Sequence, residues 1–104
     1  MLRIRLFCNQ GMSTSLLVNA MKKAAEEEKL DVDIKAYPIN ELDSIIKECD
    51  CALLGPQVGY TKEKSQKIGN QNHVPVDVIP MRDYGMCNGK NVLAFAKELA
   101  AKTV

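Results

Sequence analysis

The chain has 104 residues, which is enough for one compact domain and too few for two ordinary ones. Hydrophobic residues make up 46% of it, so a core can form without disulfides or metal. The 14 basic residues nearly balance the 13 acidic ones, and this net charge of +1 argues against a general nucleic-acid or membrane-surface binder.

The sequence lacks the patterns of an exported or membrane-spanning protein. The opening apolar run is short and is interrupted by Arg3 and Arg5, so we expect no secretory signal. No apolar stretch approaches the roughly 20 residues of a membrane span, so we expect no direct membrane insertion. The four cysteines are therefore expected to be reduced thiols in a cytoplasmic protein rather than two disulfides.

The first half of the chain alternates between strand and helix patterns. Residues 2–7 are predicted to form a strand with one apolar face made by Leu2, Ile4 and Leu6. Residues 16–29 are predicted to form a helix whose apolar stripe comprises Leu16, Leu17, Ala20, Met21 and Ala24. Residues 31–37 alternate as a second strand, which Pro38 ends. Asn40 is predicted to cap the next helix, whose apolar face comprises Leu42, Ile45, Ile46 and Cys49.

The second half continues the alternation. Residues 51–54 are wholly apolar, which is typical of a central parallel strand buried on both faces. Residues 60–68 form a weaker, mostly polar helix pattern, and residues 76–79 are predicted to be a fourth strand that Pro80 closes. Residues 88–102 are predicted to form the last helix, with an inward face of Val92, Leu93, Ala96, Leu99 and Ala100.

The order of elements predicts an α/β fold in a single domain over residues 1–104. Four βα units imply a parallel sheet with helices on both faces. The small, flavodoxin-like version of this architecture has the strand order 2-1-3-4. Ligands of such sheets bind beyond the carboxyl ends of the strands, near the switch point, which here lies between strands 1 and 3.

The stretch CNQGMSTS, residues 8–15, connects the first strand to the first helix at that point. A helix N-terminus attracts anions, and Gly11 allows a tight turn or close approach to a ligand. Ser13, Thr14 and Ser15 add hydroxyl groups, and the same field favours the thiolate of Cys8, a suitable nucleophile for a phosphoryl group. The alternative is a small buried cysteine followed by capping residues. The combination at the ligand-binding edge favours a functional site.

The same loop resembles that of low-molecular-weight protein tyrosine phosphatases, which have this fold and place a cysteine first in a strand-to-helix loop. Their pattern needs an arginine six residues later, where this chain has Thr14, and the loop contains no arginine or lysine. Arginine binds phosphate bidentately and stabilises the charge of the transition state. Without it, the loop is better suited to a phosphorylated intermediate that waits for an acceptor.

Two alternatives to a phosphoryl carrier remain at the level of sequence. A small phosphatase would use Asp83 as a general acid, although a solvated loop aspartate next to Arg82 is the favoured interpretation. A flavodoxin-like module could hold the phosphate of FMN with the hydroxyl residues of the first turn. Only three Tyr, two Phe and no Trp are available to sandwich the flavin ring.

Three blocks of sequence resemble the enzyme IIB component of bacterial phosphoenolpyruvate-dependent sugar phosphotransferase systems, of the lactose/cellobiose (chitobiose) type. They are LFCNQGMSTSLLVNAM, ALLGPQVGY and VPVDVIPMRDYGMCNGKNVL, and they follow one another along nearly the whole chain. The first block contains the Cys-x-x-Gly-Met-Ser-Thr-Ser pattern of that family and is the most specific.

The resemblance implies a phosphotransferase that needs no cofactor. Cys8 would accept a phosphoryl group from a phosphohistidine of the IIA component and pass it to a sugar bound by the membrane IIC component. The sugar would be a β-linked disaccharide such as cellobiose, chitobiose or lactose, or an aromatic β-glucoside. The protein would be cytoplasmic and transiently at the inner face of the membrane.

The resemblance also implies a phosphate-binding loop. It comprises Asn9, Gln10, Gly11, Met12, Ser13, Thr14 and Ser15. The Met12 thioether is further expected to contact partner proteins, because a flexible side chain suits successive docking to two of them. Gln57 and Tyr60 follow the third strand and are expected at the rim of the site or at a partner surface, although Tyr60 could equally pack at a helix start.

The remaining chemically reactive residues are interpreted as structural or solvated. Cys49 and Cys51 are expected in the core, and a zinc site that joins them to Cys87 and His73 is disfavoured by their spacing. His73 is expected in a solvated loop at the amino end of the sheet. A solvated helix face is expected for Lys62, Lys64 and Lys67.

Overall fold

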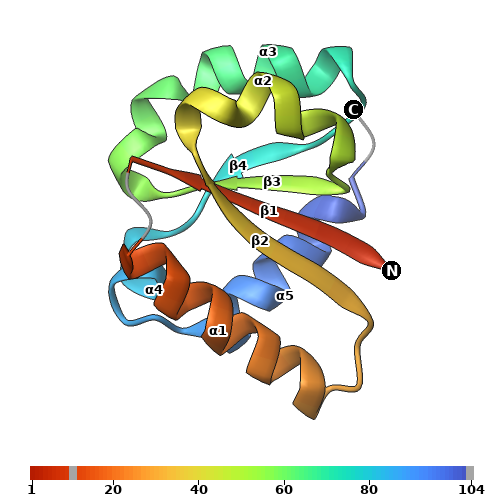
Figure 1. Ribbon diagram of the computed structural model, residues 1–104, viewed down its shortest axis with the longest axis vertical. Helices are drawn as coiled ribbons and strands as arrows, with labels where there is room; N and C mark the ends of the chain where they lie inside the picture. Colours follow the sequence, from red (N-terminus) through yellow and green to blue (C-terminus); the bar gives the residue numbers. More distant parts are fainter. Residues whose placement is uncertain (10–11, 103–104) are drawn as a thin grey trace.

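A computed structural model gives the structure and describes residues 1–9 and 12–102 (Figure 1). A four-stranded parallel sheet has the order β2-β1-β3-β4. Its strands are β1 (Leu2–Cys8), β2 (Val32–Pro38), β3 (Cys51–Leu54) and β4 (Val76–Val78). The predicted flavodoxin-like α/β fold and its strand order of 2-1-3-4 are therefore confirmed.

Helices cover both faces of the sheet. The α-helices are α1 (Met12–Glu27), α2 (Leu42–Ile45), α3 (Lys62–Gln71), α4 (Met81–Gly85) and α5 (Gly89–Ala100). Short 3-10 helices are η1 (Ile39–Glu41), η2 (Ile46–Glu48) and η3 (Pro56–Thr61). Figure 1 shows α2 and α3 on one side of the sheet and α1, α4 and α5 on the other.

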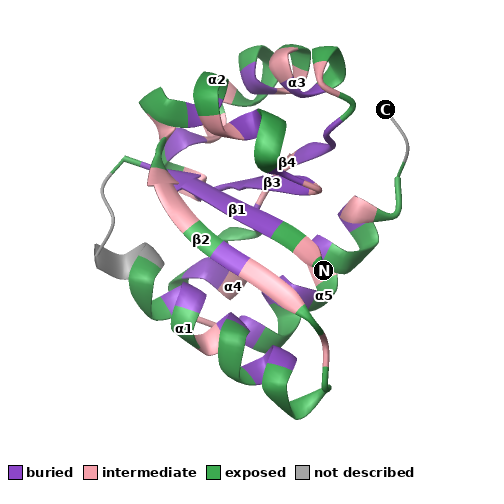
Figure 2. Ribbon diagram, turned by 45° about the vertical axis from the view of Figure 1, so that its right-hand side comes forward, coloured by how far each residue is buried: buried purple, intermediate pink, exposed green. Residues whose placement is uncertain are grey.

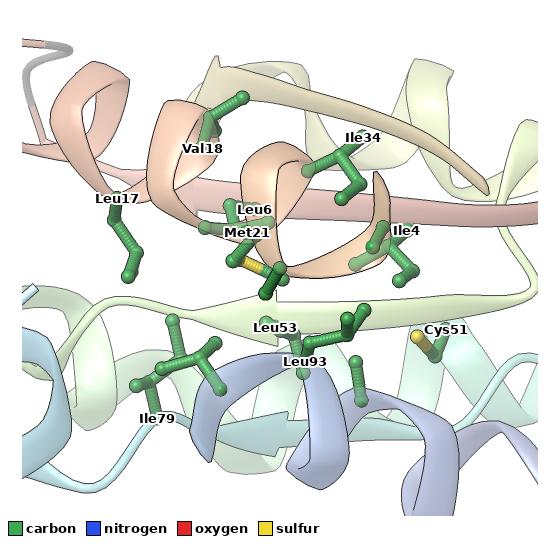
Figure 3. Packing of buried hydrophobic residues seen from close by; sticks show 14 of the residues in the cluster. Ile4, Leu6, Leu17, Val18, Met21, Ile34, Cys51, Leu53, Ile79 and Leu93 are labelled. Carbon is green, nitrogen blue, oxygen red and sulfur yellow. The ribbon is translucent and has the colours of Figure 1, made fainter. Parts of the chain in front are cut away.

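Each face of the sheet has its own apolar cluster. The cluster beneath α1 and α5 includes Ile4, Leu6, Leu17, Met21, Leu53 and Leu93 (Figure 3). The cluster beneath α2 and α3 includes Phe7, Leu42, Ile46, Ala52, Leu54 and Val58. The two central strands, β1 and β3, supply residues to both clusters and are mostly buried, as Figure 2 shows. Alternation along these strands thus explains the two-sided core.

Several predicted boundaries and contacts differ from the structure. Helix α1 begins at Met12, four residues earlier than predicted, and Leu16 is 64% exposed rather than in the core. Asn40 does not cap a helix, because it lies inside η1, whose N-cap is Pro38, and the N-cap of α2 is Glu41. Helix α4 was not predicted. Each difference involves a short helix or a helix end, where apolar periodicity is weakest.

Arg5 is a buried cation within the sheet. Its side chain is 3% exposed and forms an ion pair with Asp33 on β2, with 2.9 Å between Nη2 and Oδ2. Its Nη1 also donates to the main-chain carbonyl of Asp33 at 2.7 Å. The hydrogen bond from Arg5 holds the pKa of the Asp33 carboxyl below its usual value. The pair therefore joins the edge strand β2 to the central strand β1.

Asp33→Asn is expected to lower the free energy of unfolding by about 2 kcal/mol at neutral pH, because it leaves the buried Arg5 cation without a counter-charge. The cost stays below that of a fully buried pair because the Asp33 side chain is 31% exposed. Since the folded-state pKa of Asp33 is lowered, the stabilisation is complete above the unfolded pKa and is lost as pH falls through the folded one. Urea titrations at pH 7 and pH 3 should show the wild-type advantage shrinking in acid; an equal advantage at both would contradict this assignment.

Candidate functional site

Cys8 lies at the carboxyl edge of the sheet, at the switch point between β1 and β3. It is the last residue of β1 rather than the first residue after it, and it is 2% exposed. The amide of Gly55 donates to the carbonyl oxygen of Phe7 at 2.8 Å, so the loop after β3 runs directly beside the end of β1. The loops that follow the first and third strands therefore meet at the switch point.

The N-terminus of α1 follows four residues after Cys8. The first turn of this 16-residue helix contains no acidic residue, so its positive end is not offset by a carboxylate within that turn. The backbone of Met12, Ser13 and Thr14 forms this turn. A strand end followed at once by a helix start is the geometry that anion-binding loops use in α/β folds.

The other predicted loop residues have differing positions. Asn9 is exposed, and Ser15 lines a hollow of about 390 Å³ between α1 and β2 with neighbours that include Lys22 and Lys35. Gln10 and Gly11 lie outside the described residues, as does the predicted partner contact of the Met12 side chain. Their predicted roles therefore stay predictions.

The two predicted rim residues point to different places. Gln57 is exposed, and its Oε1 lies 2.9 Å from the position that a Cβ atom at Gly55 would occupy, beside Cys8. Tyr60 is 81% exposed and lines a hollow over α3, so it is not a packing residue. Of these two residues, the structure thus places Gln57 close to Cys8 and places Tyr60 on a different surface.

An apolar hollow that the sequence did not indicate lies beside Gln57. Its volume is about 460 Å³, and its lining residues are Pro56, Gln57, Met81, Tyr84, Gly85 and Cys87. Most of them belong to the unpredicted helix α4 and the turn after it. Met81 is 76% exposed. In the sequence, the two methionines of MRDYGM are the residues that could have indicated an accessible apolar surface here.

The cysteines other than Cys8 are structural or peripheral. Cys49 and Cys51 are buried as predicted, and burial raises the pKa of both thiols to about 12. Cys87 is half-buried. All four cysteines are described, and none forms a disulfide. Over residues 1–9 and 12–102, no group of three or more His, Cys, Asp or Glu residues could hold a metal ion.

Alkylation should separate these thiols in the Cys8→Ser background. At pH 8, iodoacetamide is expected to modify Cys87 and to spare Cys49 and Cys51 until the protein is unfolded, because their thiolate forms are suppressed by burial. Peptide mass spectrometry with and without urea measures this. Modification of all three thiols at similar rates in the folded protein would contradict the structure.

His73 and Asp83 do not add a catalytic group to the described site. His73 is exposed and precedes β4, at the amino end of the sheet, as predicted. Asp83 is half-buried within α4 rather than in a solvated loop. Its carboxylate accepts a hydrogen bond from Asn91 at 3.2 Å, and its main-chain carbonyl accepts one from Asn88 at 2.9 Å. Asp83 therefore joins α4 to α5.

Comparison with known families decides what kind of protein carries this site. Residues 3–95 match the family described as PTS system, Lactose/Cellobiose specific IIB subunit. The chain belongs to this family. It is therefore the IIB component of a sugar phosphotransferase system, a phosphotransferase that works with IIA and IIC partners.

Individual relatives agree with the family assignment. This IIB component is 45% identical over 101 residues to the galactose-specific EIIB component of Lactococcus lactis subsp. cremoris, with 92% of this chain and 94% of the relative covered. It is 44% identical, with the same coverage, to the cellobiose-specific EIIB component of Lactococcus lactis subsp. lactis. The matches extend over almost the full length of both relatives.

A solved structure confirms the fold. The lactose-specific IIB component domain from Streptococcus pneumoniae superposes with a TM-score of 0.85 over 94% of this chain and 96% of that one, at 17% identity. Within residues 1–9 and 12–102 of this IIB component, no helix is both long and apolar enough to cross a membrane.

Proposed function

We propose that Cys8 is the residue that carries the phosphoryl group of this IIB component. The observation that supports this most directly is the placement of a cysteine at the end of β1, at the switch point of the sheet and four residues before the N-terminus of α1. A phosphoryl group on the sulfur there would meet the positive end of a helix, which stabilises a bound anion.

The proposed reaction has two transfers. In the first, Sγ of Cys8 attacks the phosphorus of a phosphohistidine on IIA, so the S–P bond forms as the P–N bond breaks and its electron pair returns to the imidazole. In the second, a sugar hydroxyl oxygen attacks the same phosphorus, the S–P bond breaks, and Cys8 leaves as a thiolate while the hydroxyl proton is released. Backbone amides and hydroxyls of Asn9, Gln10, Gly11, Met12, Ser13, Thr14 and Ser15 hold the phosphoryl group between the two transfers.

A carrier explains the site better than a phosphatase does. The loop has Thr14 where a phosphatase of this fold needs arginine, so it lacks the cation that accelerates hydrolysis. Asp83, the only candidate for a general acid that the sequence offered, accepts a hydrogen bond from Asn91. A phosphorylated cysteine that is slow to hydrolyse is the requirement for handing phosphate to a second partner.

The sugar is proposed to be a β-linked disaccharide bound by the membrane component IIC. The family is described for lactose and cellobiose, and both of these are β-linked disaccharides. The relatives named for galactose and for cellobiose are almost equally similar to this chain, so they favour neither sugar. The proposed place of action is the cytoplasm, transiently at the inner face of the membrane.

Phosphoryl transfer from labelled phosphoenolpyruvate tests the proposal. With enzyme I, HPr and IIA of a lactose/cellobiose-type system, the chain should incorporate one phosphoryl group, and tandem mass spectrometry should find it on Cys8. Omission of IIA should prevent incorporation. Rapid hydrolysis of an aryl phosphate by the chain alone would instead support a phosphatase.

A further inference from the structure

Gly55 lies where β3 ends, directly beside Cys8. Its φ of −63° and ψ of 149° are angles that any residue adopts, so the backbone does not require glycine at this position. Gly55 is buried, and its amide is fixed by the hydrogen bond to Phe7. An advantage of glycine here must therefore come from the space that a side chain would fill.

The Gln57 side chain occupies that space. A Cβ atom at position 55 would lie 2.9 Å from Gln57 Oε1, which is closer than carbon and oxygen normally approach. The same Cβ atom would lie 3.5 Å from Cys8 Cβ and 3.5 Å from the carbonyl oxygen of Phe7, which are ordinary contact distances. The absence of a side chain at Gly55 thus leaves space next to Cys8, and the Gln57 amide lies at this space.

The backbone on both sides of Gln57 is held in place. Pro56 precedes it with a fixed φ, and Val58 follows it with no exposed surface. The Val58 amide donates to the carbonyl of Gly55 at 3.0 Å, and the Val58 carbonyl accepts from the Thr61 hydroxyl at 2.7 Å. Only the side chain of Gln57 must be ordered when it binds a ligand, which limits the entropic cost.

We propose that the Gln57 amide donates a hydrogen bond to the phosphoryl group on Cys8, an inference that rests on the proposed function of Cys8. Rotation about the last side-chain bond exchanges the amide oxygen and the NH2 group, so the side chain presents a donor once a phosphate oxygen is there. Gln57 is thus a binding residue for the phosphorylated state, supplied by the loop after β3 rather than by the loop after β1.

A neutral amide suits a carrier. Its NH2 group stabilises a phosphate oxygen as a donor, but the amide does not ionise near neutral pH and cannot activate water as a general base. Arginine in such a position would add a full positive charge and assist hydrolysis. Gln57 therefore holds the phosphoryl group without promoting its loss to water.

The equilibrium of phosphoryl transfer between IIA and this IIB component measures how much Gln57 stabilises the phosphoryl group on Cys8. Phosphorus NMR distinguishes phosphohistidine from phosphocysteine in a mixture prepared with phosphoenolpyruvate, enzyme I, HPr and IIA. Gln57→Ala is expected to shift the equilibrium about tenfold toward phosphorylated IIA, because a hydrogen bond to a charged group is lost. Gln57→Glu is expected to shift it further, because a carboxylate repels the phosphoryl group.

An exposed glutamine at the other end of the sheet gives a matched control. Gln71 is the last residue of α3, and Gln71→Ala is expected to leave the equilibrium within about twofold of wild type. Because Gln57 is exposed, removing its side chain opens no cavity, and circular dichroism should show an unchanged fold. An equilibrium for Gln57→Ala equal to that of Gln71→Ala would overturn the inference.

Gly55→Ala tests the same contact from the other side. Among the described atoms nearest to its methyl group, the Gln57 amide oxygen alone would lie closer than 3.0 Å, and this flexible side chain must move aside. Gly55→Ala should therefore shift the equilibrium about threefold in the wild-type background and little in the Gln57→Ala background. Equal effects in both backgrounds would contradict the pairing of the two residues. Absence of any label on wild-type Cys8 would refute the proposed function itself, whereas normal labelling of Cys8 together with an unshifted equilibrium in Gln57→Ala would refute only the role of Gln57.

Discussion

Cys8→Ser is expected to reduce phosphoryl transfer from IIA by a factor on the order of 10³ or more, because a serine hydroxyl is not ionised near neutral pH and is a far weaker nucleophile than a thiolate. Serine has the same shape as cysteine, with a smaller oxygen in place of the sulfur. The variant should therefore fold normally. The rate of label incorporation from phosphoenolpyruvate, with circular dichroism beside it, measures the effect.

Cys87→Ser is the matched control for this experiment. Cys8, Cys49 and Cys51 are buried, whereas Cys87 is half-buried and lines the apolar hollow that also includes Gln57. Its removal is expected to leave the stoichiometry of labelling unchanged and the rate within about twofold. Undiminished labelling of Cys8→Ser, or loss of labelling in Cys87→Ser alone, would assign the phosphoryl group to a different residue.

The arrangement of the sheet was predictable because strand patterns in this chain are unambiguous. Residues Cys51–Leu54 are apolar without interruption. In a sequence of alternating strands and helices, such a run indicates a strand that is buried on both faces. The topological rule for ligand sites then placed the loop after Cys8 at the switch point without any knowledge of side-chain contacts. Both results follow from the order of elements alone.

The helix ends were less predictable because their sequence signals compete. Ser13, Thr14 and Ser15 favour a loop or a cap as readily as a first helical turn, so the start of α1 was placed four residues too late. Helix α4 has only five residues, too few for an apolar stripe to repeat. Leu16 consequently looked like a core residue, although the actual register of α1 directs it outward.

The relation between Gln57 and Cys8 could not be predicted in detail. Gln57 and Tyr60 are three residues apart in η3, a spacing that places side chains on the same side of a regular 3-10 helix. The non-helical φ of −112° and ψ of 18° at Val58 interrupts that helix, and the two side chains line different surfaces. Only the distances around Gly55 show that Gln57 lies beside the cysteine.

Gly89→Ala is expected to destabilise the protein by about 3 kcal/mol or more, since it forces apart two helices that pack backbone to backbone. A Cβ atom at position 89 would overlap the carbonyl carbon of Ala20 and would lie 2.5 Å from the Ala20 oxygen and 2.6 Å from the amide nitrogen of Met21. These are main-chain atoms of α1, so only a displacement of α1 relative to α5 can relieve the overlap. Thermal unfolding should show a fall in Tm of roughly 15 °C.

The consequence of Gly89→Ala for function follows from the same displacement. The N-terminus of α1 carries the proposed phosphate-binding turn, so a shift of this helix against the sheet moves the anion-binding end away from Cys8. Gly85→Ala is the control, because a Cβ atom there meets nothing within 4 Å, and it should change stability by no more than about 0.5 kcal/mol. Equal stability of the two variants would show that α1 and α5 do not approach each other as closely as Gly89 indicates.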